Sequence, residues 1–264
     1  MNILSLVENT TKCELKVKHA LSLYIETAKH KLLFDVGQDS TLFQNAKTRN
    51  IDLTKVDTVI ISHGHKDHGG ALKDFLAINH TAKVYIQRKA FGVHSTKVMG
   101  FKVPIGLDES LKNHPQVVLL DGNYKIDEEL SLFIVKDNSR CHSTANDILF
   151  SGKVVDDFVH EQNLIINENS TVLIMGCGHT GIVNIMEEAK SYHPTLCIGG
   201  YHLMNPVNKK CVPDELLDQI AAYMNQYPDT KFYTCHCTGE KAYNYLASKV
   251  PNLSYFACGD QLKA

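Results

Sequence analysis

Three histidines and one aspartate fall within six residues directly after a short apolar run, and this cluster constrains the chain more than any other feature. Residues 58–70 read TVIISHGHKDHGG. The β-branched run at the start predicts a buried strand. His63 and His65 lie two positions apart, so an extended or turning backbone directs both imidazoles to one side. Asp67 and His68 follow one turn later, where a helix can begin.

Neutral imidazoles with a nearby carboxylate are ligands for transition metals, so this cluster predicts a site for one or two divalent ions, Zn first, with Mn or Fe as alternatives. A histidine-rich surface loop without metal is the competing interpretation. The strand directly before the cluster disfavours it, because that is the context in which such a motif binds metal.

The length and the net charge of the chain limit the class of protein to which it can belong. The 264 residues suffice for one large domain or two fused halves, and 44% hydrophobic content fits a sheet core covered by helices. A net charge of -2 provides no polybasic surface, so we expect a small-molecule substrate and neither nucleic acid nor a membrane as partner. The first eight residues lack the basic lead of a signal peptide, and eight cysteines without a CxxC pair indicate reduced thiols. We therefore expect a cytoplasmic protein.

Strands and helices alternate along most of the chain. Apolar runs predict strands at 2–7, 21–27, 31–37, 83–87, 117–121, 124–135, 195–203 and around 172 and 233. Helical patterns occupy 39–50, 71–79, 180–192, 213–227 and 240–250. The polar stretch 136–157 predicts either an active-site flap or a surface excursion, with Arg140 and His142 in solvent. Asp156, Asp157 and Glu161 form an acidic cluster that is expected at the surface, with a place beside the metal ligands as the alternative. His160 lies outside every ligand loop.

After residue 170, a strand, a loop with glycine and histidine, and a helix recur three times. The loops read GCGHTG at 176–181, GGYHL at 199–203 and TCHCTG at 234–239. His179 therefore follows a strand's carboxyl end, where sheet proteins bind ligands. Cys177 can share a side with His179 and is an alternative ligand.

The two cysteines that flank His236 are expected to be poor ligands. Side chains alternate along an extended segment, so Cys235 and Cys237 should point away from the side that His236 faces.

The HGHKDH spacing at 63–68, with FDVG at 34–37 and the three later histidine loops, resembles the metallo-β-lactamase superfamily. The set is similar to a branch of metal-dependent hydrolases related to dihydropterin ribofuranosylaminobenzene phosphate synthase. This resemblance covers nearly the full chain. It implies an α/β, four-layer αββα sandwich in a single domain, 1–264, whose similar halves are approximately 1–135 and 136–264, with the site at the sandwich edge.

The resemblance also implies roles for individual residues. His63 and His65 hold one metal, with His179 as the third ligand. Asp67 and His68 hold the other, with His236. The resemblance places Asp35 where it orients a ligand. Cys177 is expected beside the ligands. Since six ligands are found without His202, we expect it to contact substrate, with a turn histidine bonded to the backbone as the alternative. Asp67 is also the catalytic residue, which orients or deprotonates a water.

One departure concerns the aspartate that bridges the metals in many members, within a Gly-Asp pair after a strand. Here that strand ends in Gly178-His179, and the only Gly-Asp pair, Gly259-Asp260, comes after His236. Either His179 fills the third-ligand place with no bridging carboxylate, or the second metal is weakly held.

Hydrolysis of an ester or phosphoester by a metal-activated water is the expected function. The first alternative is a pterin-type condensation, which needs aromatic rings around the pocket. The second is a metal- or ligand-binding protein without turnover, which needs no open coordination position.

Overall fold

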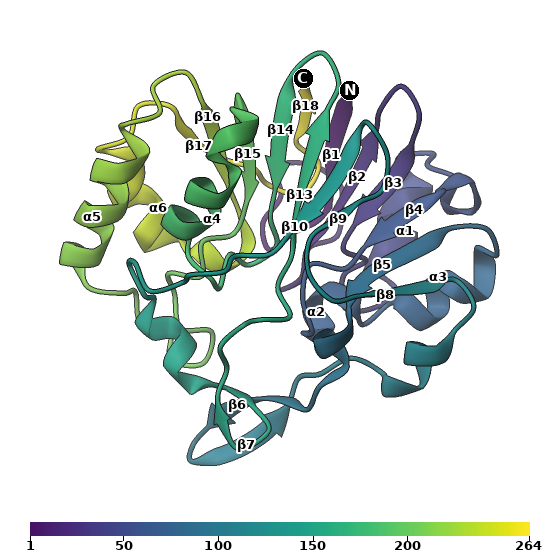
Figure 1. Ribbon diagram of the computed structural model, residues 1–264, viewed down its shortest axis with the longest axis horizontal. Helices are drawn as coiled ribbons and strands as arrows, with labels where there is room; N and C mark the ends of the chain where they lie inside the picture. The colour runs from purple at the N-terminus through teal and green to yellow at the C-terminus, as the bar shows by residue number, and fades with distance from the viewer.

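Two seven-stranded sheets face each other, and helices cover the outer face of each (Figure 1). The computed structural model describes residues 1–264. In spatial order, the first sheet contains β18 (Gln261–Lys263), β1 (Asn2–Val7), β2 (Ser22–Glu26), β3 (Lys31–Phe34), β4 (Thr58–Ile60), β5 (Lys83–Gln87) and β8 (Val117–Leu120). The second contains β17 (Leu253–Tyr255), β16 (Lys231–Thr234), β15 (Leu196–Gly199), β14 (Thr171–Ile174), β13 (Asn163–Asn167), β10 (Leu130–Phe133) and β9 (Tyr124–Lys125).

The helices lie where the sequence predicted them, shorter by a few residues at their ends. The first sheet is covered by α1 (Thr41–Thr48) and α3 (Leu72–Ile78), and the second by α4 (Ile182–Ala189), α5 (Asp214–Met224) and α6 (Glu240–Ala247). A single turn, α2 (Lys66–Gly69), carries part of the histidine cluster. The predicted four-layer αββα sandwich is confirmed. No helix combines the length and apolar character that crossing a bilayer requires.

Three apolar cores separate the four layers. Val172 and Ile174 of β14 face the core between the sheets, whereas Leu173 faces the core beneath the helices. This alternation follows from the two-residue period of a strand whose two faces are both buried. β4 obeys the same rule, with Ile60 between the sheets and Val59 beneath the helices.

Parallel pairing brings the histidine-containing loops to one edge. β3, β4, β5 and β8 run parallel in the first sheet, and β14 to β17 run parallel in the second. The carboxyl ends of parallel neighbours meet at the same edge of a sheet, so the loops after β4, β14, β15 and β16 can gather there.

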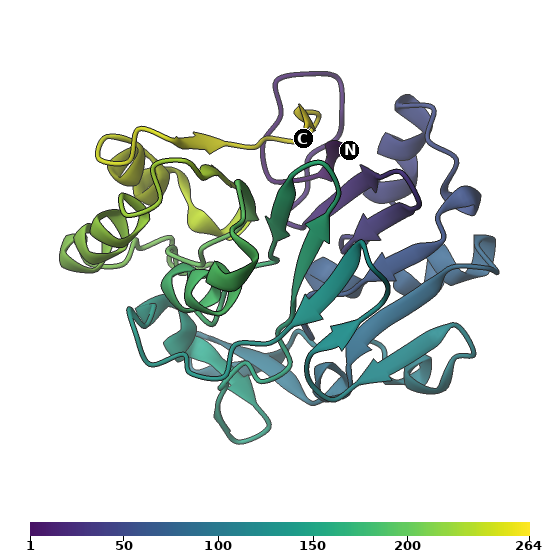
Figure 2. The same cartoon turned by 45° about the horizontal axis from the view of Figure 1, so that its top comes forward.

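The expected halves, 1–135 and 136–264, match the two sheets only approximately. β9 and β10 precede residue 135 but belong to the second sheet, where β10 pairs with β13. β18 returns from the far end of the chain to pair with β1. The two termini therefore lie together (Figure 2), and the Met1 amino group donates to the Ala264 carbonyl at 2.7 Å.

A third, four-stranded sheet projects from the sandwich edge and was not predicted. Its order is β12 (Val154–Val155), β11 (Leu149–Ser151), β6 (His94–Val98) and β7 (Phe101–Pro104). The β6–β7 hairpin forms its outer part (Figure 1). The stretch 136–157, expected as a flap or surface loop, supplies the edge strand β12 and its neighbour β11.

Candidate metal centre

His63, His65 and His179 converge at the edge of the sandwich. His63 and His65 lie in the loop after β4, and His63 Nε2 is 3.1 Å from His65 Nδ1. His179 comes from the loop after β14, and the three rings offer nitrogens all within 4.8 Å of one another. A Cβ on Gly176 would lie 2.6 Å from Ser62 Cβ, so only glycine lets the two loops approach this closely.

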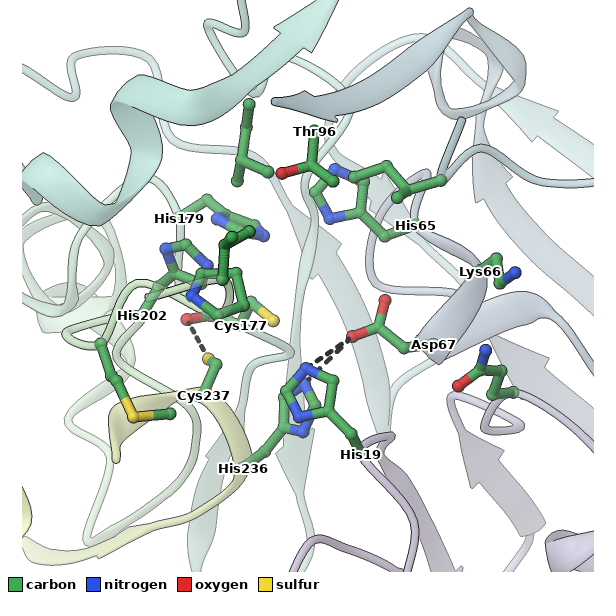
Figure 3. Close-up of a pocket in the computed structure, with 16 residues that line it drawn as sticks. His19, His65, Lys66, Asp67, Thr96, Cys177, His179, His202, His236 and Cys237 are labelled. Atoms are coloured by element: carbon green, nitrogen blue, oxygen red, sulfur yellow. Dashed lines mark hydrogen bonds and ion pairs between the residues drawn. The ribbon is translucent and has the colours of Figure 1, made fainter. Parts of the chain in front are cut away.

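Asp67, His68 and His236 form a second group beside the first. Asp67 Oδ2 is 3.3 Å from His236 Nε2 and 3.7 Å from His68 Nε2. His236 follows β16 and has a φ of 53°, which is uncommon for a residue with a Cβ. Figure 3 shows that Asp67 faces His236 and His19 across the cavity, and His19 Nε2 is 3.8 Å from Asp67 Oδ2.

Asp35 fixes the orientation of two of these imidazoles. Asp35 Oδ2 accepts hydrogen bonds from Ser62 Oγ at 2.7 Å and from His68 Nδ1 at 2.6 Å. Ser62 Oγ in turn accepts from His63 Nδ1 at 2.8 Å. With the protons on both Nδ1 atoms, the Nε2 lone pairs of His63 and His68 point into the cluster.

Two asparagines fix the other pair of imidazoles in the same way. Asn146 Oδ1 accepts from His179 Nδ1 at 2.9 Å, and its Nδ2 donates to the His179 carbonyl at 2.8 Å. Asn9 Oδ1 accepts from His236 Nδ1 at 3.0 Å, and its Nδ2 donates to the His236 carbonyl. The Nε2 atoms of both histidines are buried without a hydrogen-bond partner. Such lone pairs are costly to bury unless a ligand satisfies them.

The protonation states of the residues in the cluster favour the binding of a cation. Burial, together with the neighbouring imidazoles, lowers the pKa of His63 and His179 well below its usual range, so both rings are neutral. Burial raises the pKa of Asp67, but His68 and His236 outweigh it and hold that pKa well below normal. Burial also lowers the pKa of His68, but Asp35 and Asp67 raise it to about 9. The two carboxylates thus draw a positive charge to this point, which a divalent ion can supply in place of a proton.

His202 lies beside the two groups. It is buried, its ring centroid is 4.2 Å from that of His179, and its Nδ1 has no partner. It belongs to none of the groups whose atoms are close enough together to hold one ion. His202 does line the adjoining cavity of about 210 Å³, together with His19, Gln38, His65, Lys66, Asp67, Thr96, Ile105, Leu149, Cys177, His179, Met204, Pro206, Val207, His236 and Cys237.

Several residues that shape the site carry no signal in the sequence. The loop before β2 supplies Asn9 and His19, and the loop before β11 supplies Asn146. Glu161, expected at the surface, is buried and accepts from the backbone N–H groups of His179 and Thr180 at 2.8 Å each. Nothing in the local sequence marks these residues, because each acts on a loop distant in the chain.

A family model described as the metallo-beta-lactamase superfamily matches residues 16–190, which is more than half of the chain. The chain belongs to this superfamily. It is 31% identical over 260 residues to the uncharacterized protein MJ0448 of Methanocaldococcus jannaschii, covering 95% of both chains. It is 28% identical over 259 residues to 7,8-dihydropterin-6-methyl-4-(beta-D-ribofuranosyl)-aminobenzene-5'-phosphate synthase of the same organism, covering 86% of this chain and 83% of the relative. The expected branch is confirmed.

Among solved structures, Tm1679, described as a metal-dependent hydrolase of the beta-lactamase superfamily, superposes with a TM-score of 0.82 at 23% identity. The match covers 100% of this chain and 99% of that one. It confirms the fold along the whole chain.

A thiol lies between the two groups of histidines. Cys177 Sγ is 3.2 Å from His68 Nε2 and lies within 4.8 Å of ligand atoms of both His63 and His236. The only Gly-Asp pair is elsewhere, since Asp260 is bound to the backbone of Ala257. Cys177, expected only beside the ligands, therefore has a more central place than the sequence suggested.

The expectation for Cys237 was wrong. Residues 236–238 form a helical turn, so the alternation of an extended segment does not apply. Cys237 Sγ donates to the Cys177 carbonyl at 3.4 Å and lies within 4.8 Å of ligand atoms of His236. Cys235 does point away, into the core between the sheets.

A second buried polar network supports the loop between the first two histidines, and it corrects two expectations. Asp156 Oδ2 accepts from His94 Nδ1 at 2.9 Å and from His160 Nε2 at 3.1 Å, so Asp156 is not a surface acid. His160 Nδ1 accepts from the Gly64 N–H at 3.0 Å, so His160 adjoins the ligand loop. Both ring nitrogens of His160 are therefore hydrogen-bonded, and this network holds the backbone next to His65.

Proposed function

We propose that this protein is a metal-dependent hydrolase of an ester or phosphoester. His63, His65 and His179 hold one divalent transition metal ion, and Asp67, His68 and His236 hold a second. The observation that carries this proposal is the convergence of imidazole lone pairs, fixed by hydrogen bonds on their far side, beside an open cavity. Zn, Mn and Fe all accept this donor set, and Zn is preferred.

A divalent ion bound here would supply Lewis acidity and lower the pKa of a water. The chain's own residues then orient the reactants. The Asp67 carboxylate faces the cavity and accepts a hydrogen bond from the attacking water. The low pKa of Asp67 makes it an orienting acceptor that stays ionised during turnover. His202 contacts the substrate from the opposite wall.

Likeness to the synthase of Methanocaldococcus jannaschii supports a second candidate, a condensation on a pterin. A pterin is a flat ring system that binds by stacking on aromatic side chains. The cavity is lined by no Phe, Tyr or Trp, and its volume is about 210 Å³. Hydrolysis of a smaller substrate therefore fits the cavity better.

A third candidate is metal binding without turnover. This function needs no cavity beside the ligands, whereas here the cavity walls include Asp67, His179 and His236 themselves. An open approach to the ligand groups favours catalysis. We also propose a reducing, cytoplasmic location, in keeping with the eight free cysteines.

Elemental analysis of the purified protein, followed by a substrate screen, tests the proposal. The protein is stripped with chelator, reloaded with Zn, Mn or Fe, and assayed on aryl esters, thioesters and phosphodiesters. We expect two ions per chain at saturation and metal-dependent release of product. Absence of uptake would refute the metal site, and uptake without an exchangeable water would favour metal binding without turnover. Turnover of a reduced pterin alone would favour the synthase.

A further inference from the structure

One face of the β6–β7 hairpin is an outward continuation of the cavity wall. Thr96 of β6, Leu149 of β11 and Ile105 just after β7 all line the cavity. Leu149 pairs with Thr96 on one side, and Val103 pairs with Thr96 on the other. Residues paired directly across antiparallel strands project on the same side, so Val103 stands on the face that reaches the metal centre.

The same face stays apolar out to the tip of the hairpin. Val98 and Phe101 form the next cross-strand pair on this face, since Val98 lies two positions from Thr96 and Phe101 lies two positions from Val103. Phe101 is 76% exposed and Val103 is 42% exposed. We call Val98, Phe101 and Val103 the apolar strip. A large apolar ring left this exposed beside a catalytic cavity marks a binding surface.

The opposite face of the same sheet has a different character. It carries Lys97 and Lys102, and Lys102 Nζ lies 4.0 Å from the centroid of the Phe150 ring while donating to the Gly152 carbonyl. The aromatic ring on that side is therefore already covered by a neighbour. On the face toward the metal centre, by contrast, the Phe101 ring is 76% exposed.

The facing wall of the cavity is apolar as well. The loop after β15 contributes Met204, Pro206 and Val207, and Val207 is 41% exposed. The only charged side chains in the cavity wall are Lys66, which is exposed, and Asp67, which lies beside the histidines. The cavity thus has a polar, metal-binding end and an apolar exit.

We propose that the substrate carries a flexible apolar tail, such as an acyl chain of several carbons, which leaves the metal centre along the apolar strip. The reactive ester lies at the histidines, and the tail passes Thr96 and Leu149 to Val103 and Phe101. This inference rests on the proposed hydrolase function and names its substrate class. A second copy of this chain fits less well, because the strip opens directly into the cavity and would be blocked by a permanent partner.

Binding of straight-chain carboxylates tests the strip without requiring turnover. The probes are butyrate, hexanoate, octanoate and decanoate, measured by calorimetry on Zn-loaded protein below their micelle concentrations. We expect affinity to rise about twofold per methylene, half the free energy of full burial, because the strip covers one side of the chain. Phe101→Ser and Val103→Ser should each flatten this series.

Val155→Ser is the matched control. Val155 is 49% exposed in the same small sheet, but its pairing with Phe150 puts it on the opposite face. It should leave the chain-length series unchanged. Equal affinity for all four carboxylates, or equal effects of Val103→Ser and Val155→Ser, would overturn the proposal. So would a wild-type dimer that Phe101→Ser dissociates in sedimentation, since the strip would then be an interface between copies.

A parallel series of p-nitrophenyl esters separates this inference from the proposed function. Hydrolysis of all esters at rates independent of chain length would support the hydrolase and refute the apolar strip. Chain-length-dependent binding of carboxylates with no hydrolysis of any ester would support the strip and refute ester hydrolysis.

Discussion

Asn9 and His236 are 227 positions apart in the sequence, yet the Asn9 carboxamide holds the His236 ring and backbone together. Its Oδ1 accepts from His236 Nδ1 at 3.0 Å, and its Nδ2 donates to the His236 carbonyl at 3.0 Å. The carboxylate of Glu8 accepts from the His236 N–H at 2.7 Å. These bonds hold a residue with a positive φ and point its Nε2 at Asp67.

The first prediction is that Asn9→Ala weakens metal binding. Loss of the acceptor frees the imidazole to rotate and change tautomer, so affinity at the second position should fall 10- to 100-fold. Asn9→Asp keeps an acceptor at the same place and should retain more of the affinity. Asn225→Ala removes an exposed carboxamide at the end of α5 and is the control. Competition with a chelator measures all three, and unchanged affinity in Asn9→Ala would contradict the prediction.

The sequence was sufficient to predict those parts of the site that are formed by short, continuous motifs. The cluster from His63 to His68 follows a strand whose apolar period is plain, and His179 and His236 repeat the same order of strand, loop and helix. Parallel strands then bring their carboxyl ends together without further information. The fold and the convergence of these residues could therefore be predicted.

Apart from Asp35, the residues that support the site could not be predicted, because they act only after the chain has closed. Asn9 and Glu161 lie in irregular loops and Asn146 in a short 3-10 turn, and all three contact segments distant in the chain. The third sheet was not predicted for a different reason. Its outer hairpin alternates in the expected way, but Met99 and Gly100 were not recognised as its turn.

The second prediction concerns His63→Ala. This change removes a buried nitrogen 3.1 Å from His65 Nδ1, so most of the metal at the first position should be lost. His80→Ala is the control, because His80 is exposed and lies in the turn after α3. His160 does not serve as a control, since it bonds to Gly64. Metal content by elemental analysis decides, and full occupancy in His63→Ala would exclude this residue as a ligand.

The third prediction is that Cys177 binds metal as a thiolate. Burial and the adjacent Cys237 raise the pKa of this thiol well above its ordinary value in the metal-free chain, and a coordinated ion would deprotonate it. Protein loaded with Co²⁺ should then show a sulfur-to-metal charge-transfer band. Cys177→Ser should abolish the band, and Cys197→Ser, buried beneath the helices, should preserve it. A band that survives in Cys177→Ser and disappears in Cys237→Ser would assign the ligand to Cys237.

The fourth prediction is that His202→Ala lowers activity with metal content intact. His202 lines the cavity and stacks near His179, but it joins none of the groups that could hold an ion. Loss of one substrate contact should reduce kcat/KM by about 10- to 100-fold, or 1.4 to 2.7 kcal/mol. Elemental analysis of the same sample provides the check. Metal loss in this variant would move His202 into the ligand set.

The last prediction concerns pH and His30, which links the two sheets far from the metal centre. Its Nδ1 is 2.9 Å from Asp57 Oδ1, before β4, and its Nε2 is 2.7 Å from Asp127 Oδ2, between β9 and β10. Burial lowers the pKa of His30, but the two carboxylates outweigh it, and the net shift is upward. A raised pKa stabilises the folded state below the ordinary histidine value of about 6.5, and this stability is lost as pH rises through the folded pKa.

His30→Gln should therefore destabilise the protein at about pH 6 and have little effect at about pH 9. The expected loss at the lower pH is on the order of 1 kcal/mol, because both carboxylates are partly exposed and solvent screens the pair. Burial raises the pKa of Asp127, but its hydrogen bond with His30 outweighs this, and the net shift of that pKa is downward. The destabilisation by His30→Gln should therefore shrink again only at acidic pH, where Asp127 becomes protonated. Urea unfolding of wild type and variant at each pH measures the difference, which cancels any change in metal affinity common to both. An equal loss of stability at both pH values would mean that His30 acts by packing alone and that its charge does not join the sheets.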